Sequence, residues 1–152
     1  MKFFLFVFEG IAFGMPMGCV AEFIQAPGNS GTLIGASVGD VFFSIPHFFG
    51  KGAVPAPHGI VLKSFPCSQG VTEALRGYAG GEVRHIVLLT TPIEREIDIP
   101  DETIRQLPAF LGLPGKLPFL TGVSFTGTTM TAYIDPQALV SCILRDVTGG
   151  SP

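Results

Sequence analysis

The run of six apolar residues from Phe3 to Phe8 constrains the fold more than any other feature of this sequence. Lys2 precedes the run and Glu9 ends it, so the run is shorter than the apolar segment of a secretory signal. Successive side chains of a strand point to opposite faces, and the phenylalanines here fall on both. We therefore expect a strand over residues 2–8 that is buried on both of its faces.

The composition indicates more apolar surface than one chain of this size buries easily. The 152 residues fit a single domain over 1–152. Hydrophobic residues make up 47% and charged residues only 14%, whereas about 25% charged is typical of soluble domains. Because antiparallel sheets usually keep one face in water, we expect a second subunit to cover part of the Phe-rich strands. The chain is therefore predicted to be a homo-oligomer, and the alternatives for the phenylalanines are a ligand cavity and an ordinary core.

Charge, length and cysteine spacing disfavour several classes of protein. A net charge of -3 supplies no basic surface for nucleic acid. No uncharged apolar stretch with the character of a membrane span reaches the roughly 20 residues that a span needs. Three cysteines without a CxxC pair, Cys19, Cys67 and Cys142, suggest reduced, buried thiols in a cytoplasmic protein. We expect no metal site and no cofactor.

The centre of the chain predicts a β-α-β unit over about residues 59–90. Ile60 to Leu62 is apolar on both faces, as a central strand would be. Ser68 can cap a helix that Gly80 and Gly81 end. Residues 83–89 form a second apolar run. A strand, a helix and a strand in this length favour a parallel pair with a right-handed crossover.

The second half predicts an edge strand, a hairpin and a final helix. Residues 93–99 alternate between isoleucine or arginine and acidic residues, which is typical of a sheet edge with one solvated face. Residues 123–134 suggest a hairpin, and Asp135 followed by Pro136 is a good helix start. The predicted fold class is α+β, a mostly antiparallel, Phe-rich sheet system with one β-α-β unit and a C-terminal helix.

The predicted crossover suggests one site for chemistry. Cys67 would lie at the carboxyl end of a strand and the start of a helix, where backbone N–H groups bind anions and lower the pKa of a thiol. The second parallel strand would end at the same edge of the sheet, where ligands of open α/β sheets bind. Cys67 is the candidate nucleophile, and the candidate ligand-binding residues are Ser68, Gln69, Gly70, Thr90 and Thr91.

A nucleophilic cysteine also needs a base, and His47 is the candidate. His58 precedes the first strand of the predicted unit and would lie at the opposite edge from Cys67. His85 lies within the second strand and is expected to be a core residue. The alternative for Cys67 is an inert thiol packed under a loop, and for the histidines loop positions with no special role.

Three functions are compatible with these features. The leading hypothesis is a subunit of a homo-oligomeric or larger assembly with no chemistry of its own. The second is an enzyme or small-anion binder that uses Cys67 at a helix start. The third is a carrier of an apolar small molecule in a cavity lined by phenylalanine. The sequence alone does not decide whether the chain is an enzyme.

Overall fold

The computed structural model describes residues 1–25, 40–50, 54–63, 73, 75–77, 80–81, 83–105, 119–126 and 128–147. The chain divides into two compact units. The first comprises Met1–Cys19 and Ile93–Cys142, and the second comprises Val20–Pro92 and Ile143–Pro152. The single domain expected from the sequence stays a prediction.

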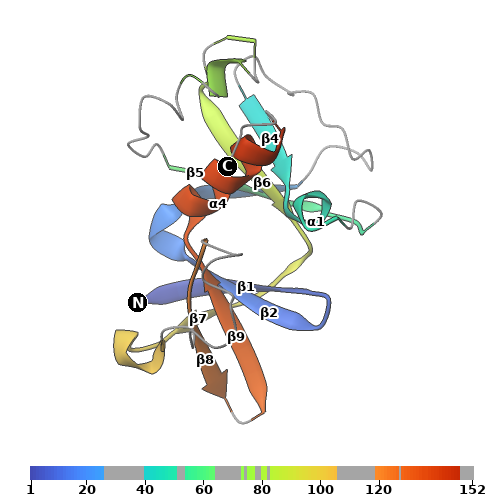
Figure 1. The fold of residues 1–152 in the computed structure, drawn as a ribbon. Helices are drawn as coiled ribbons and strands as arrows, with labels where there is room; N and C mark the ends of the chain where they lie inside the picture. Colours follow the sequence, from blue (N-terminus) through green and yellow to red (C-terminus); the bar gives the residue numbers. More distant parts are fainter. Residues whose placement is uncertain are drawn as a thin grey trace. The chain divides into compact units, whose positions relative to one another are not determined.

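The first unit contains a five-stranded sheet with the strand order β7-β1-β2-β9-β8 (Figure 1). All neighbours in it are antiparallel except β2 and β9, which are parallel. A turn with positive φ at Glu9 and Gly10 joins the first two strands. The strands are β1 (Lys2–Phe8), β2 (Ile11–Pro16), β7 (Ile93–Asp98), β8 (Leu120–Thr126) and β9 (Thr129–Ile134).

Strand β1 is apolar on both faces, as predicted, and the chain itself buries it. The rings of Phe6 and Phe13 stack with centroids 5.7 Å apart, and Phe3 meets Tyr133 edge-on at 4.7 Å. Of the residues Phe3 to Phe8, only Val7 is exposed. Each buried phenylalanine stabilises the fold by about 1.5–3 kcal/mol. The expectation that a second subunit covers this strand is therefore wrong.

The second unit contains a four-stranded sheet with the order β3-β5-β6-β4. Strand β6 lies in its interior and is buried from Ile86 to Thr90. Its core includes Val61, Val87 and Leu89, against which Ile24 and Phe42 pack. The strands are β3 (Val20–Gln25), β4 (Asp40–Ser44), β5 (His58–Leu62) and β6 (His85–Thr90).

The predicted crossover between two parallel strands does not occur. Strands β5 and β6 are adjacent, but they pair antiparallel, with His58 opposite Thr90 and Val61 opposite Val87. Helical residues do lie between them, at 73 and 75–77. The connection is long enough to return the chain to either end of β5, so a helix between two strands does not fix their direction. The parallel partner of β6 is β4.

The edge strand, the hairpin and the final helix lie where the sequence predicted them, whereas the short helices at Ile45–Phe48 and Met17–Cys19 were not predicted. Strand β7 lies at a sheet edge, and β8 and β9 form the predicted hairpin. A short α1 (Ile45–Phe48), capped by Ser44, follows β4. Helix α4 (Pro136–Val147) begins after Asp135. Two short 3-10 helices are η1 (Met17–Cys19) and η2 (Asp101–Thr103).

The α+β class with a C-terminal helix is confirmed. No helix in the described residues has the length and apolar character needed to cross a membrane.

Candidate interaction surface

The structure separates the residues of the predicted Cys67 site. Cys67, Ser68, Gln69 and Gly70 lie outside the described residues. The antiparallel pairing places Thr90 beside His58, at the opposite end of the shared register from Leu62, the last residue of β5. The pairing of β5 with β6 therefore does not bring Cys67 and Thr90 to one edge of the sheet, and a ligand site at residues 67–70 stays a prediction.

His47 and the two threonines do share an edge of the second sheet. Strands β4 and β6 are parallel, with Ser44 opposite Leu89, so their carboxyl ends lie side by side. His47 follows β4 on α1 and is exposed. Thr90 and Thr91 are buried, and the Thr90 hydroxyl has no hydrogen-bond partner. These are the only candidate site residues whose positions the described part of the chain gives.

Among the described residues, the other histidines and cysteines are not grouped in a way that could bind a metal ion. His85 begins β6 and is exposed, so the expectation of a core histidine there is wrong. Cys19 and Cys142 are half-buried and form no disulfide. Within the described residues, no group of three or more His, Cys, Asp or Glu side chains is arranged to hold a metal ion.

The most distinctive surface of the first unit is an exposed row of apolar side chains across three neighbouring strands. Met130 on β9 is directly opposite Phe125 on β8. Ala12 of β2 is opposite Thr131 of the parallel strand β9. One residue earlier in both strands, Ile11 therefore lies beside Met130. Directly opposite residues point to the same face of a sheet, so these side chains form one row. We name Ile11, Met130 and Phe125 the apolar row.

The apolar row continues the core outward to the surface. One step inward on the same face, Phe13 pairs with Ala132, and Ala132 pairs with Val123. All three are buried, at 8%, 4% and 5% exposure. In the apolar row, by contrast, Ile11 is 37%, Met130 38% and Phe125 63% exposed. The apolar row is therefore the solvent-exposed continuation of the buried core on this face of the sheet.

The strands that hold the apolar row carry no charged residue. None occurs in β2, β8 or β9. Thr128 and Thr129, at the tip of the hairpin, are exposed and polar without charge. The central part of a protein–protein interface has this character, because it is poor in charge and rich in aromatic residues and methionine. Such an exposed patch is typical of a surface that contacts another molecule.

The sequence predicted the hairpin but not this surface. The alternation of Val123 and Phe125 indicates one face of a strand. It does not predict at which of these residues the side chains stop being buried by the rest of the chain. The position at which burial ends depends on β2, a strand that the local sequence pattern does not predict. The excess of apolar residues led us to expect uncovered surface on the Phe-rich first strand, which the chain itself buries, and not at this row.

No protein-family model matches the sequence, and no curated protein matches it. Among solved structures, the chain is similar to the scaffolding protein TtCheW from Thermoanaerobacter tengcongensis. The TM-score is 0.57 at 14% sequence identity, and the match covers 88% of this chain and 83% of that chain. The similarity shows that the two β-sheets and the C-terminal helix form a CheW-like fold.

Proposed function

We propose that this chain is a non-enzymatic scaffolding subunit of the CheW type, and that the apolar row is one of the surfaces through which it holds another protein molecule. The observation that carries the proposal is the combination of a scaffold-like fold with an exposed, uncharged row that continues the core. A fold alone does not give a function, so the row supplies the site on which the proposal depends.

Self-association is the form of this function that the composition favours. Phe125 is the most exposed large apolar side chain of the described residues. Burying it against a second molecule would remove more apolar area from water than burying any other single side chain of the row. A cytoplasmic location belongs to the same proposal.

The experiment is size-exclusion chromatography with light scattering over a range of concentrations. Wild type is expected to exceed the monomer mass of 16.1 kDa as its concentration rises. A variant with Phe125→Ser and Met130→Ser is expected to remain a monomer. Phe23→Ser is the matched control, because Phe23 is an exposed phenylalanine of the second unit, at 42%. A wild type that stays monomeric throughout contradicts self-association, and an associating row variant contradicts the role of the row.

A further inference from the structure

We propose that the outer edge of β7 binds an extended, lysine- or arginine-rich segment of a partner protein, which adds to the sheet as a further strand. This inference rests on the proposed scaffolding function and names the chemistry of one partner. It concerns a different surface of the first unit from the apolar row.

Among the strands that the structure describes, β7 has a neighbour on one side only, and the edge proposed for binding runs from Glu94 to Asp98. The strand ends its sheet and pairs with β1 alone among the described strands, in a register that runs from Lys2 opposite Asp98 to Phe6 opposite Ile93. None of its six side chains is buried. The N–H and C=O groups of such an edge are a template for an added strand, and recognition by strand addition uses them directly.

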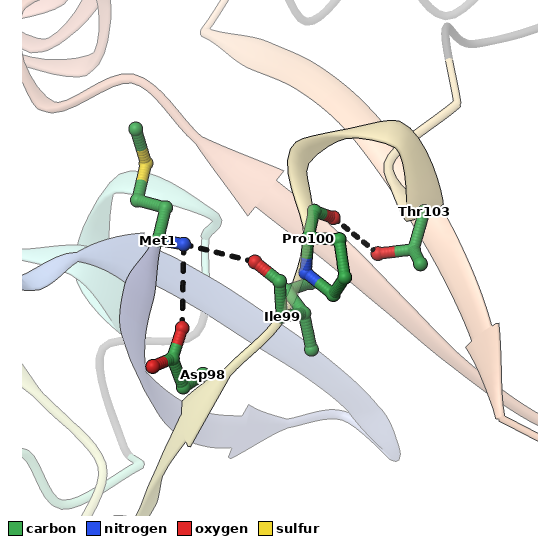
Figure 2. Close-up of polar contacts among 5 residues, drawn as sticks. All are labelled: Met1, Asp98, Ile99, Pro100 and Thr103. Atoms are coloured by element: carbon green, nitrogen blue, oxygen red, sulfur yellow. Dashed lines mark hydrogen bonds and ion pairs between the residues drawn. The ribbon is translucent and has the colours of Figure 1, made fainter.

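The end of β7 is fixed in place (Figure 2). The Met1 amine donates to Asp98 Oδ1 at 3.3 Å and to the Ile99 carbonyl at 2.9 Å. The Ile99 N–H donates to the Met1 carbonyl at 3.1 Å. The Thr103 hydroxyl donates to the Pro100 carbonyl at 2.7 Å and closes the turn that follows. A strand that is already ordered loses less conformational freedom when a partner pairs with it.

The edge is strongly negative. Residues 93–103 contain five acidic side chains and one arginine, a formal charge of −4, whereas the whole chain carries −3. Asp98 forms an ion pair with the Met1 amine. In the part of the chain that the structure describes, neither Glu94 nor Glu96 takes part in an ion pair. Both residues are exposed.

This charge decides which partner the edge accepts. Like charges directly opposite one another destabilise a strand pair, so a second copy of β7 is disfavoured. The register shift at Glu94 leaves that residue unopposed on β1, and such bulges also discourage pairing between identical edges. A basic segment reverses the sign of the effect, because its lysines would lie across from Glu94 and Glu96. Complementary charge of this kind gives an interface its specificity.

The probe is a short fluorescent peptide that alternates lysine and valine, titrated with the full-length purified chain and followed by fluorescence anisotropy. Binding is expected, and amide signals of residues 93–98 are expected to shift in NMR spectra. Glu96→Lys should weaken binding about tenfold, because an attractive cross-strand pair becomes a repulsive one. Glu22→Lys, which changes an exposed strand glutamate of the second unit by the same charge, should leave binding unchanged.

A second peptide separates strand addition from simple charge attraction. It has the same sequence, but alternate backbone nitrogens are methylated so that one edge cannot donate hydrogen bonds. Loss of binding by this peptide supports the proposal. No binding of the unmodified peptide, equal binding of the methylated one, or no effect of Glu96→Lys overturns it. The Phe125→Ser and Met130→Ser variant should bind the peptide as wild type does, so failure at this edge is distinguishable from failure of the scaffolding function.

Discussion

The hydroxyl oxygens of Ser124 on β8 and Tyr133 on β9 lie 2.7 Å apart and form a buried hydrogen bond. Tyr133 is 1% and Ser124 8% exposed, so water does not replace either partner easily. The bond ties together the two strands that carry Phe125 and Met130, and it lies beside the edge-on contact of Tyr133 with Phe3.

Removing both partners of this bond should cost less than the two single removals added together. Tyr133→Phe or Ser124→Ala leaves a buried hydroxyl without a partner and should lower the free energy of unfolding by about 1–3 kcal/mol. The double variant should lose less than the sum of the two single variants. Urea unfolding of the four proteins measures the coupling. Strictly additive losses would contradict a direct bond between the two hydroxyls.

Gly14 should not tolerate a larger side chain. A Cβ at this position would lie 2.9 Å from Cδ1 and Cε1 of Tyr133 and 3.2 Å from Cδ2 of Leu5. Gly14→Ala is therefore expected to destabilise the chain by about 1–3 kcal/mol through overpacking. Gly18→Ala is the control, since a Cβ there has no heavy atom within 4 Å. Thermal unfolding compares the two, and equal melting temperatures would contradict the close packing of Tyr133 on Gly14.

Asp135 should contribute to the start of α4. Its Oδ1 accepts a hydrogen bond from the Gln137 N–H at 3.0 Å. Asp135→Ala should lower stability by about 1 kcal/mol, whereas Asp135→Ser should retain most of it, because serine also accepts from the first turn. Chemical denaturation followed by circular dichroism measures both. An alanine variant as stable as wild type would show that the cap contributes nothing.

Thr90→Val should raise the stability of the chain. The Thr90 side chain is fully buried and its Oγ1 has no hydrogen-bond partner. Valine has nearly the same shape without the hydroxyl, so the substitution should add about 1 kcal/mol to the free energy of unfolding. A loss of stability instead would indicate that the hydroxyl binds a group in the native protein and would revive the ligand site predicted at residues 90 and 91.

Local patterns predicted the elements that one segment determines by itself. The strand at residues 2–8 follows from an apolar run between two charges, and the edge strand at 93–98 follows from alternation. The start of α4 follows from Asp135 and Pro136. In each case the signal and the structure involve the same few residues.

Strand pairing could not be predicted in the same way, because it depends on contacts between distant segments. The order of the second sheet joins β6 to β4 and β5, which come from separate parts of the chain. The site at Cys67 was predicted on the expectation that β5 and β6 are parallel. They pair antiparallel, so that expectation no longer supports the site. The strand β2 was missed because Gly14 and Pro16 weaken its local pattern.

The sequence predicted that β1 is buried, but it did not predict which segments of the chain bury it. Phe13 and Tyr133 supply part of that cover from β2 and β9. The expectation from composition, that a second subunit covers this strand, was wrong, and exposed apolar side chains lie instead at Ile11, Met130 and Phe125.

The most direct test of the scaffolding function is photo-crosslinking from the apolar row inside cells. A benzophenone amino acid at position 125 should give covalent adducts with other protein molecules after irradiation. The same group at position 63, an exposed lysine of the second unit that directly follows β5, should give far fewer. Protein adducts that depend on position 125 are the result predicted here, and their absence at 125 would contradict the proposal that the row holds a protein partner.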